Sequence, residues 1–184
     1  YVVYALGGIA TAVFLAFLVL LVRRAAAGEK FTTLDEKEHE LNPDILVIAD
    51  ESKALALAGV MGGLDSGVTD GTTDILLESA FFTPSEIRHT SRRLFLTSDS
   101  SYRFERGVDP NQVIPAAALA AALIAEVAGG NISLSTATAG SVPSVTSPVE
   151  LDIVRMDQLM DGSISLPDAE NILTRLGLEK AEGN

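Results

Sequence analysis

The chain has 184 residues, 13 Lys and Arg against 25 Asp and Glu, a net charge of −12, a mean hydropathy of +0.30 and no cysteine. The absence of cysteine excludes a disulfide scaffold, a cysteine-ligated zinc or iron–sulfur site and thiol catalysis, and the two histidines argue against a histidine-rich metal centre. The acidic balance argues against a chain that wraps nucleic acid over its whole surface, although a local basic patch is compatible with it.

The first 22 residues carry no charge, and 19 of them are hydrophobic. Because about 20 apolar residues span the hydrocarbon core of a membrane, this length alone fits a membrane helix. The alternative is a buried helix, broken near Gly7 and Gly8, that leads into a buried strand at residues 19–22. A signal peptide fits less well, since no basic region precedes the run. The chain does not begin with Met, and we expect it to be a fragment of a longer protein.

Short strand-like runs dominate the next part of the chain, as far as residue 82. They are bounded by charged, Gly-containing or Pro-containing turns, which is typical of strands. The predicted strands cover residues 31–34, 44–49, 54–60 and 75–82. His39 lies in the charged run at residues 36–40, which we expect to be a solvated turn without a functional role.

Helix signals follow. The sequence Thr-Pro-Ser-Glu at residues 83–86 is a capping box with Pro at the first helical position, and it predicts a helix over residues 84–94. Asp109 and Pro110 open an alanine-rich helix that should reach Val127 and end at Gly129. His89 lies on the first of these helices and is expected at the surface.

The last part of the chain looks like a second, smaller unit. Residues 131–148 are rich in Ser, Thr, Ala and Pro and predict a final strand and a linker. A strand at 149–153, a short helix from about Arg155 and a helix over 166–176 follow. The expected fold class is therefore α+β, with mixed or antiparallel sheets and a few packed helices, followed by a small truncated α/β unit.

Glu78 is the most informative single residue, because it interrupts an apolar strand. Burying a carboxylate is costly unless a hydrogen bond compensates for it. Side chains alternate along a strand, so Glu78 could face water; the other interpretation is a pocket carboxylate that binds a ligand hydroxyl. The nearby segment 59–63 lacks the Lys-Ser/Thr of a phosphate loop, and its glycines predict either a close backbone approach or a plain turn. No set of nucleophile, His and acid is convincing.

Five of the thirteen basic residues lie within residues 88–106 of this acidic chain. A solvated helix face or internal ion pairs would explain them, and a patch that faces phosphate groups is the functional alternative, since Arg suits bidentate phosphate contacts. The residues are Arg88, Arg92, Arg93, Arg103 and Arg106.

Four motifs, in this order and spacing, resemble the beta chain of bacterial-type phenylalanyl-tRNA synthetase. They are LAGVMGG at residues 57–63, LESAFF at 77–82, TSRRL at 90–94 and SYRFERGVDP at 101–110. The resemblance covers about residues 19–140, and the tail at 149–178 is similar to the start of the next domain in that chain. It implies a tRNA-editing domain at residues 1–145, with 1–18 atypical and apolar, and the truncated beginning of the following domain at 146–184.

The resemblance also implies hydrolysis of mischarged Tyr-tRNA(Phe) by water, without a side-chain nucleophile. It places Glu78 where the family binds the tyrosine hydroxyl, Gly62 where the pocket needs close approach, and Ser98 and Ser100 on the pocket wall. The arginines of residues 88–106 become candidates to face tRNA. The implied partners are the acceptor end of tRNA(Phe) and the alpha chain of a heterotetramer. The parent enzyme would be cytoplasmic and use ATP and Mg²⁺, while this fragment would hold no cofactor and no metal.

One departure from the family pattern lowers the expected activity. The family carries a Leu-Gly-x-Pro-x-His-Ala-Phe-Asp motif upstream, and no His, Pro or Asp stands in any nearby register of residues 6–14. We therefore expect weak or absent editing by this chain. The alternatives are a non-catalytic module that binds tRNA or a partner through a vestigial pocket, and a soluble domain anchored in a membrane by residues 1–22, which the resemblance makes less favourable.

Overall fold

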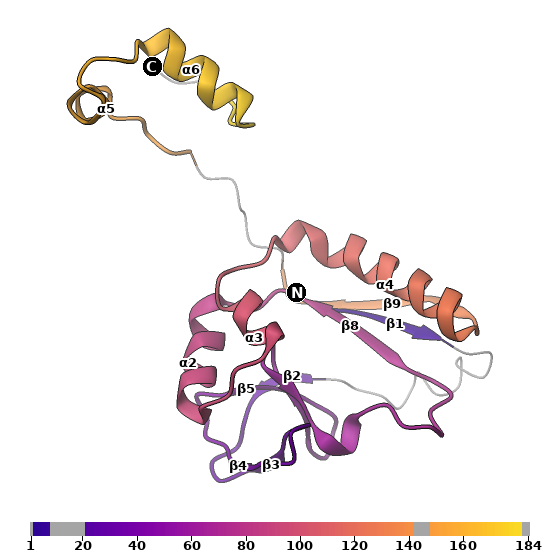
Figure 1. Ribbon diagram of the computed structural model, residues 1–184. Helices are drawn as coiled ribbons and strands as arrows, with labels where there is room; N and C mark the ends of the chain where they lie inside the picture. Colours follow the sequence, from indigo (N-terminus) through magenta and orange to yellow (C-terminus); the bar gives the residue numbers. More distant parts are fainter. Residues whose placement is uncertain (1, 8–20, 142–147, 182–184) are drawn as a thin grey trace. The chain divides into compact units, whose positions relative to one another are not determined.

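The computed structural model describes residues 2–7, 21–141 and 148–181 (Figure 1). The chain divides into two compact units, Tyr1–Pro143 and Ser144–Asn184, and each is described by itself. The first unit combines antiparallel sheets with packed helices, so the α+β class is confirmed.

A three-stranded antiparallel sheet has the strand order β8–β1–β9. Its strands are β1 (Val2–Gly7), β8 (Leu76–Ala80) and β9 (Ile132–Ala139). Val2 lies opposite both Ala80 and Ala139, so the N-terminal strand forms the middle of the sheet. Both helical predictions for the start of the chain, a membrane helix and a buried helix broken near Gly7 and Gly8, are wrong for residues 2–7, which form a strand, and residues 8–20 lie outside the described part.

A second antiparallel sheet has the order β2–β5–β6–β7, and a separate hairpin pairs β3 with β4. The strands are β2 (Leu21–Arg24), β5 (Leu46–Ala49), β6 (Ala54–Leu57), β7 (Met61–Gly62), β3 (Lys30–Thr32) and β4 (Glu38–Glu40). The main core lies on this sheet, where Ile45, Val47 and Leu57 are at most 1% exposed. His39 lies in β4 rather than in the predicted turn, and it is half-buried with Nε2 3.2 Å from Thr33 Oγ1.

Among the described residues of the first unit, three α-helices accompany the sheets: α2 (Pro84–Leu94), α3 (Asp99–Phe104) and α4 (Val113–Ala128). Short 3₁₀ turns occupy Leu64–Ser66 and Pro110–Gln112. The bounds of α2 match the prediction, although the Thr83 side chain makes no capping bond to a described residue. The sequence did not predict α3, which begins with a reciprocal capping box between Ser98 and Ser101.

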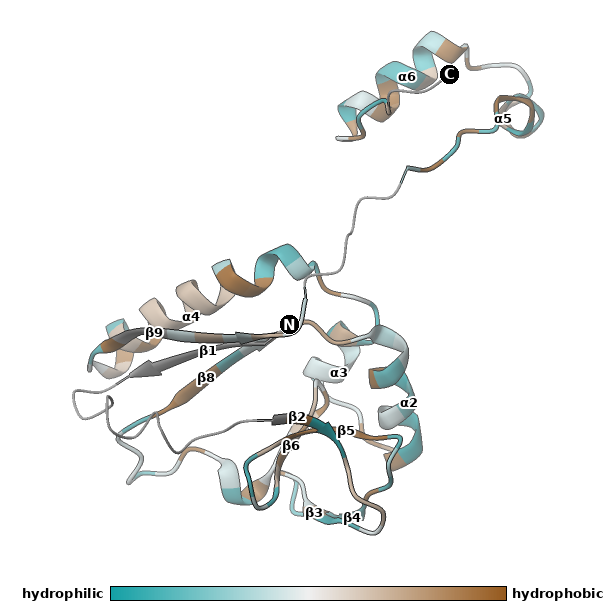
Figure 2. Cartoon of the chain, turned by 180° about the vertical axis from the view of Figure 1, so that it is seen from behind, coloured by the Kyte–Doolittle hydropathy of each residue, from teal (hydrophilic) through white to brown (hydrophobic). Residues whose placement is uncertain are grey.

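Helix α4 lies along the three-stranded sheet (Figure 1). Ser79 Oγ donates a hydrogen bond to the Val113 carbonyl over 2.8 Å, and Phe81 packs against Val113 and Ala117. Among the described residues, the stretch Pro110–Ala128 is long and apolar enough to cross a membrane by length and composition alone. The side of α4 that faces away from the sheet is also apolar, since Leu119, Leu123 and Val127 are exposed. Figure 2 shows brown and pale brown colours, which mark hydrophobic residues, along most of this helix.

The second unit contains α5 (Ile153–Met160) and α6 (Leu166–Arg175). The predicted strand at residues 149–153 is wrong, because no strand occurs among the described residues of this unit. Asp152 instead caps α5 by accepting the Arg155 N–H over 3.0 Å, so the chain turns directly into a helix. Ser165 caps α6 by accepting the Asp168 N–H.

Candidate functional site

Glu78 stands on the face of β8 that is turned toward the main core. Alternation along the strand puts Leu76, Glu78 and Ala80 on one face, with Leu77 and Ser79 on the other. Ser79 bonds the start of α4, whereas Ala80 is buried in the core built on the second sheet and Leu76 packs against it. The Glu78 side chain therefore projects away from α4, toward the main core. In Figure 1, α4 and the second sheet lie on opposite sides of β8.

The Glu78 carboxyl is crowded but accessible. By surface area the residue is exposed, yet the protein atoms around it desolvate the carboxylate and raise its pKa to about 7. Glu78 makes no side-chain hydrogen bond or ion pair with any described residue. A carboxyl near half-titration at neutral pH, without an internal partner, can accept or donate a hydrogen bond to a ligand.

Ser98 and Ser100 join the start of α3 to the turn between β6 and β7. Ser98 Oγ donates to the Val60 carbonyl over 2.5 Å and accepts the Ser101 N–H over 3.0 Å. Ser100 Oγ donates to the Gly59 carbonyl over 3.1 Å. Both hydroxyl protons are therefore engaged with backbone carbonyls, and these serines fix the loop that carries Gly62 rather than offering free donors.

The glycines of this loop serve different needs. Gly59 has φ +66°, and a Cβ there would lie 2.9 Å from both Phe82 and Ile87. A Cβ on Gly63 would lie 2.7 Å from the Leu55 carbonyl oxygen. At Gly62 the nearest atom is Leu34 Cδ1 at 3.2 Å, the end of a flexible side chain. Gly59 and Gly63 are thus required by packing and backbone conformation, and Gly62 is the glycine whose substitution the fold tolerates best.

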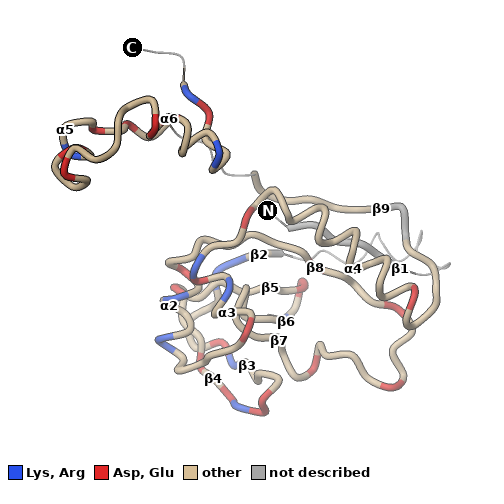
Figure 3. Tube along the Cα trace, turned by 45° about the horizontal axis from the view of Figure 1, so that its top comes forward, with Lys and Arg blue, Asp and Glu red and all other residues tan. Residues whose placement is uncertain are grey.

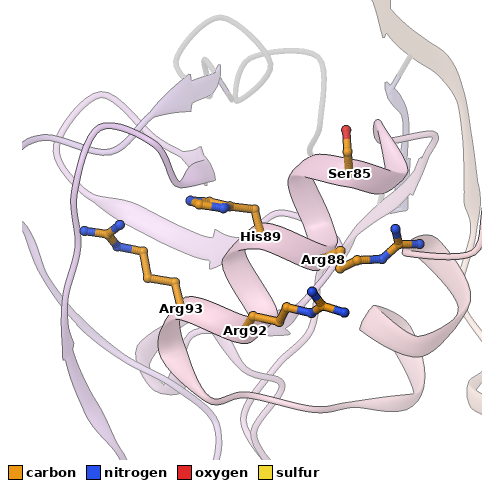
Figure 4. Close-up of a pocket in the computed structure, with 5 residues that line it drawn as sticks. All are labelled: Ser85, Arg88, His89, Arg92 and Arg93. Carbon is orange, nitrogen blue, oxygen red and sulfur yellow. The ribbon is translucent and has the colours of Figure 1, made fainter.

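The arginines of residues 88–106 divide into two groups. Three of them gather in a shallow depression of about 430 Å³ on the outer face of α2, lined by Ser85, Arg88, His89, Arg92 and Arg93. In Figure 4 these side chains leave one face of α2 and then diverge, Arg88 and Arg92 in one direction and His89 and Arg93 in the other. Figure 3 shows basic residues concentrated on α2 and α3, whereas α4 carries only the acidic Glu126. The predicted surface position of His89 is confirmed.

Arg103 and Arg106 do not line that depression. The Arg106 guanidinium lies 3.5 Å from the centroid of the Tyr102 ring and 2.6 Å from Glu105 Oε1. Of the other arginines, Arg88 donates to the Glu105 carbonyl over 2.8 Å, while Arg93 is 3.9 Å from Asp44.

A second depression of about 470 Å³ lies between α2 and α3, and sequence reasoning missed it. Its lining residues are Ser91, Arg92, Phe95, Leu96, Thr97, Ser101, Tyr102 and Glu105. Within the described chain, neither depression is lined by Glu78 or Gly62, so the arginine surface and the Glu78 face are separate features. The described residues contain no group of three or more His, Asp or Glu side chains that could hold a metal ion.

The sequence matches the B3/4 domain family over residues 16–129, more than half of the chain. It is 48% identical to the phenylalanine–tRNA ligase beta subunit of Anaeromyxobacter dehalogenans over 88% of this chain. The corresponding beta subunits of Moorella thermoacetica and Chlorobaculum tepidum are 46% and 44% identical over 89% and 85% of this chain. The chain spans about one fifth of the length of each of these three relatives, at 20%, 20% and 19%. The chain therefore belongs to the B3/4 domain family, in the form found in phenylalanine–tRNA ligase beta subunits.

Proposed function

We propose that residues 1–145 form a tRNA-editing domain that selects tyrosyl esters of tRNA(Phe) through Glu78, and that residues 146–184 begin the following domain. The observation that carries the proposal is the Glu78 carboxyl, accessible and without a partner among the described residues, with a pKa raised to about 7 by desolvation. The similarity to phenylalanine–tRNA ligase beta subunits over most of the chain supports this role.

The chemistry requires positive recognition of the hydroxyl. A hydrophobic synthetic pocket rejects an added hydroxyl only by a factor on the order of 100, so correction needs a second site that binds tyrosine and not phenylalanine. The Glu78 carboxylate would accept the phenolic hydrogen bond, while phenylalanine would leave the carboxylate without a partner. Water would then attack the ester, and in this proposal the turn that Ser98 and Ser100 hold through the Val60 and Gly59 carbonyls would form part of the pocket.

The whole enzyme would add the parts that this chain lacks. We propose the alpha chain of the ligase as its partner, with tRNA(Phe) as the shared substrate in the cytoplasm. ATP and Mg²⁺ would serve the aminoacylation reaction of that assembly, and no group in the described part of this chain is assigned to them.

Deacylation of tRNA(Phe) charged with radiolabelled tyrosine or phenylalanine tests the proposal on the 184-residue chain. We expect slow hydrolysis, because the family histidine is missing from residues 6–14, with Tyr-tRNA cleaved faster than Phe-tRNA. The Glu78→Ala variant should lose that preference, and Ser79→Ala, on the opposite face of the same strand, should keep it. A non-hydrolysable tyrosyl-adenosine amide provides the same comparison as a binding measurement.

Two results would count against this assignment. Rapid hydrolysis by the unmodified chain would refute the expectation of weak editing. Equal affinity for the tyrosyl and phenylalanyl amides, or equal effects of Glu78→Ala and Ser79→Ala, would refute the role of Glu78.

The arginine depression on α2 favours a second candidate, a non-catalytic module that binds RNA. Three arginines and one histidine from a single helix face provide donors for phosphate oxygens. A pure binding module would show salt-dependent affinity for tRNA without any ester hydrolysis in the same assay.

A further inference from the structure

Phe95 ends α2 in a conformation that aromatic residues rarely adopt. Its φ and ψ of 54° and 36° are left-handed, a position that usually takes glycine because a Cβ is unfavourable there. The Leu96 N–H bonds the Ser91 carbonyl over 3.0 Å, which closes the helix, and Leu96 is buried at 3% exposed. The backbone geometry therefore serves the helix end, and it gives no structural reason for a large aromatic side chain at residue 95.

The Phe95 ring contributes almost nothing to the core, since the residue is 93% exposed. It is the most exposed of the large hydrophobic residues in the described chain. Burial stabilises a protein only in proportion to the apolar area removed from water. A ring that occupies a strained position and remains in solvent is thus unfavourable for the free chain, and binding to a ligand would supply the missing contact.

The surroundings of the ring carry both aromatic and cationic groups. Phe95 and Tyr102 line the depression between α2 and α3, and Tyr102 is 55% exposed with the Arg106 guanidinium stacked on its ring. The one acid of this depression, Glu105, already lies 2.6 Å from Arg106.

Arg92 lines both depressions and so links the aromatic one to the arginine-rich one. Its guanidinium makes no ion pair with any residue in the described ranges. One nucleotide presents a flat base and, a few ångströms away, a phosphate, which is the same pairing of an aromatic surface with a cation.

We propose that Phe95 is a stacking platform for one unpaired base of an RNA strand, whose phosphates are bound by Arg92 and the arginine depression on α2. Stacking on Phe95 would add one specific contact to the RNA binding of the proposed function, on which it rests, and it does not depend on Glu78. An acidic protein segment is less well matched, because it offers anions for the arginines but no flat ring system for Phe95. Double-stranded RNA offers phosphates with its bases already stacked.

The chain contains no tryptophan, so Phe95→Trp creates a single fluorescent reporter at this position. We expect a hexanucleotide of adenosine to quench its emission as a base stacks on the indole. The Phe95→Gly chain should bind the same oligonucleotide about 5- to 150-fold more weakly than the wild-type chain does. This is the range expected for the loss of one base–aromatic stack. The thermal midpoint of Phe95→Gly should be unchanged or higher, since glycine suits the left-handed position. A purely structural role would lower it.

Inorganic polyphosphate separates the base from the phosphates. The affinity of the chain for polyphosphate should fall in the Arg92→Gln variant and stay the same in Phe95→Gly. In RNA binding, Arg92→Gln should also reduce the salt dependence of the affinity by about one released counterion. Equal RNA affinity of Phe95→Gly and the unmodified chain, or equal affinity for duplex and single-stranded RNA, would overturn the proposal. An acidic peptide that binds more tightly than RNA and is lost in Phe95→Gly would also overturn it, in favour of a protein partner.

Glu78→Ala distinguishes this inference from the editing assignment. It should leave oligonucleotide binding intact whether or not it changes the preference for tyrosyl esters, so each proposal can fail alone.

Discussion

Replacement of Glu78 by glutamine should remove a pH dependence of stability that the Glu78 carboxyl imposes. Desolvation by the surrounding protein atoms raises its pKa from 4.5 to about 7. At 1.36 kcal/mol per unit this corresponds to about 3 kcal/mol for a fully desolvated group. Because the side chain is exposed by area, solvent screening reduces the expected effect to about 1 kcal/mol.

The sign follows from proton binding. The folded state holds the Glu78 proton more tightly than the unfolded state, so this group's contribution is fully present below pH 4.5 and is lost as the pH rises through 7. Urea unfolding at pH 4.5, 5.5, 6.5 and 7.5 should show the wild-type chain losing about 1 kcal/mol relative to Glu78→Gln across this window. Ser79→Ala, which removes the hydrogen bond to Val113, should lower stability by about 1 kcal/mol at every pH.

Ionisation of the Glu78 carboxyl should also change how strongly the chain prefers tyrosyl over phenylalanyl ligands. An ionised carboxylate accepts a phenolic hydrogen bond more strongly than a neutral carboxyl does, so the preference for tyrosyl over phenylalanyl amides should rise between pH 6 and 8. Parallel stability profiles for the wild type and Glu78→Gln would refute the desolvation of Glu78. A pH-independent preference for tyrosine would refute recognition by its carboxylate.

Two further predictions concern the fold around the site. The Glu29 carboxylate is held by Arg23 at 2.7 and 2.9 Å, which lowers its pKa to about 2, so Glu29→Gln should cost about 1–2 kcal/mol at pH 7 in urea titrations. That difference should persist above pH 4.5 and shrink as the pH falls toward 2; a constant difference would contradict the ion pair as its source. Gly63→Ala should cost about 1–3 kcal/mol because its Cβ would meet the Leu55 carbonyl, whereas Gly71→Ala, with no atom within 4 Å, should unfold within about 0.5 kcal/mol of wild type. Equal unfolding midpoints for these two variants would show that the Gly63 backbone relaxes.

Short sequence patterns predict the secondary structure correctly where proline or a helix cap determines it. Pro84 marks the first turn of α2, and the helix ends at Leu94 as the pattern predicts. The opening segment gave no such signal, because a run without polar residues has neither a helical nor a strand period. Pairing of β1 with β8 and β9, strands distant in sequence, decides that residues 2–7 are extended.

In the candidate site as well, local sequence patterns predict some features, while contacts between distant residues determine the others. Glu78 is conspicuous in the sequence because a carboxylate interrupts an apolar strand, and the hydrogen bond of Ser79 to Val113 shows that Ser79 lies on the other face of β8. The bond from Ser98 to the Val60 carbonyl joins residues 38 positions apart, and no local pattern predicts it. For Phe95, the sequence shows only that a residue other than glycine follows the predicted end of the helix, and its 93% exposure in the structure is what shows that the ring is unburied.

An acidic chain can still bind an anionic strand when its cations are concentrated. At physiological ionic strength the Debye length is about 8 Å, so charges farther away are largely screened and the local group decides binding. The α2 face places Arg88, Arg92 and Arg93 together, and the acid of the adjoining depression is paired with Arg106. At low salt the net charge of −12 should oppose the approach of RNA over longer distances. Added salt should therefore lower the association rate constant less steeply than it lowers the affinity for RNA. Screening removes the long-range repulsion between the acidic chain and RNA, which favours their approach, but it also weakens the short-range contacts between arginines and phosphates.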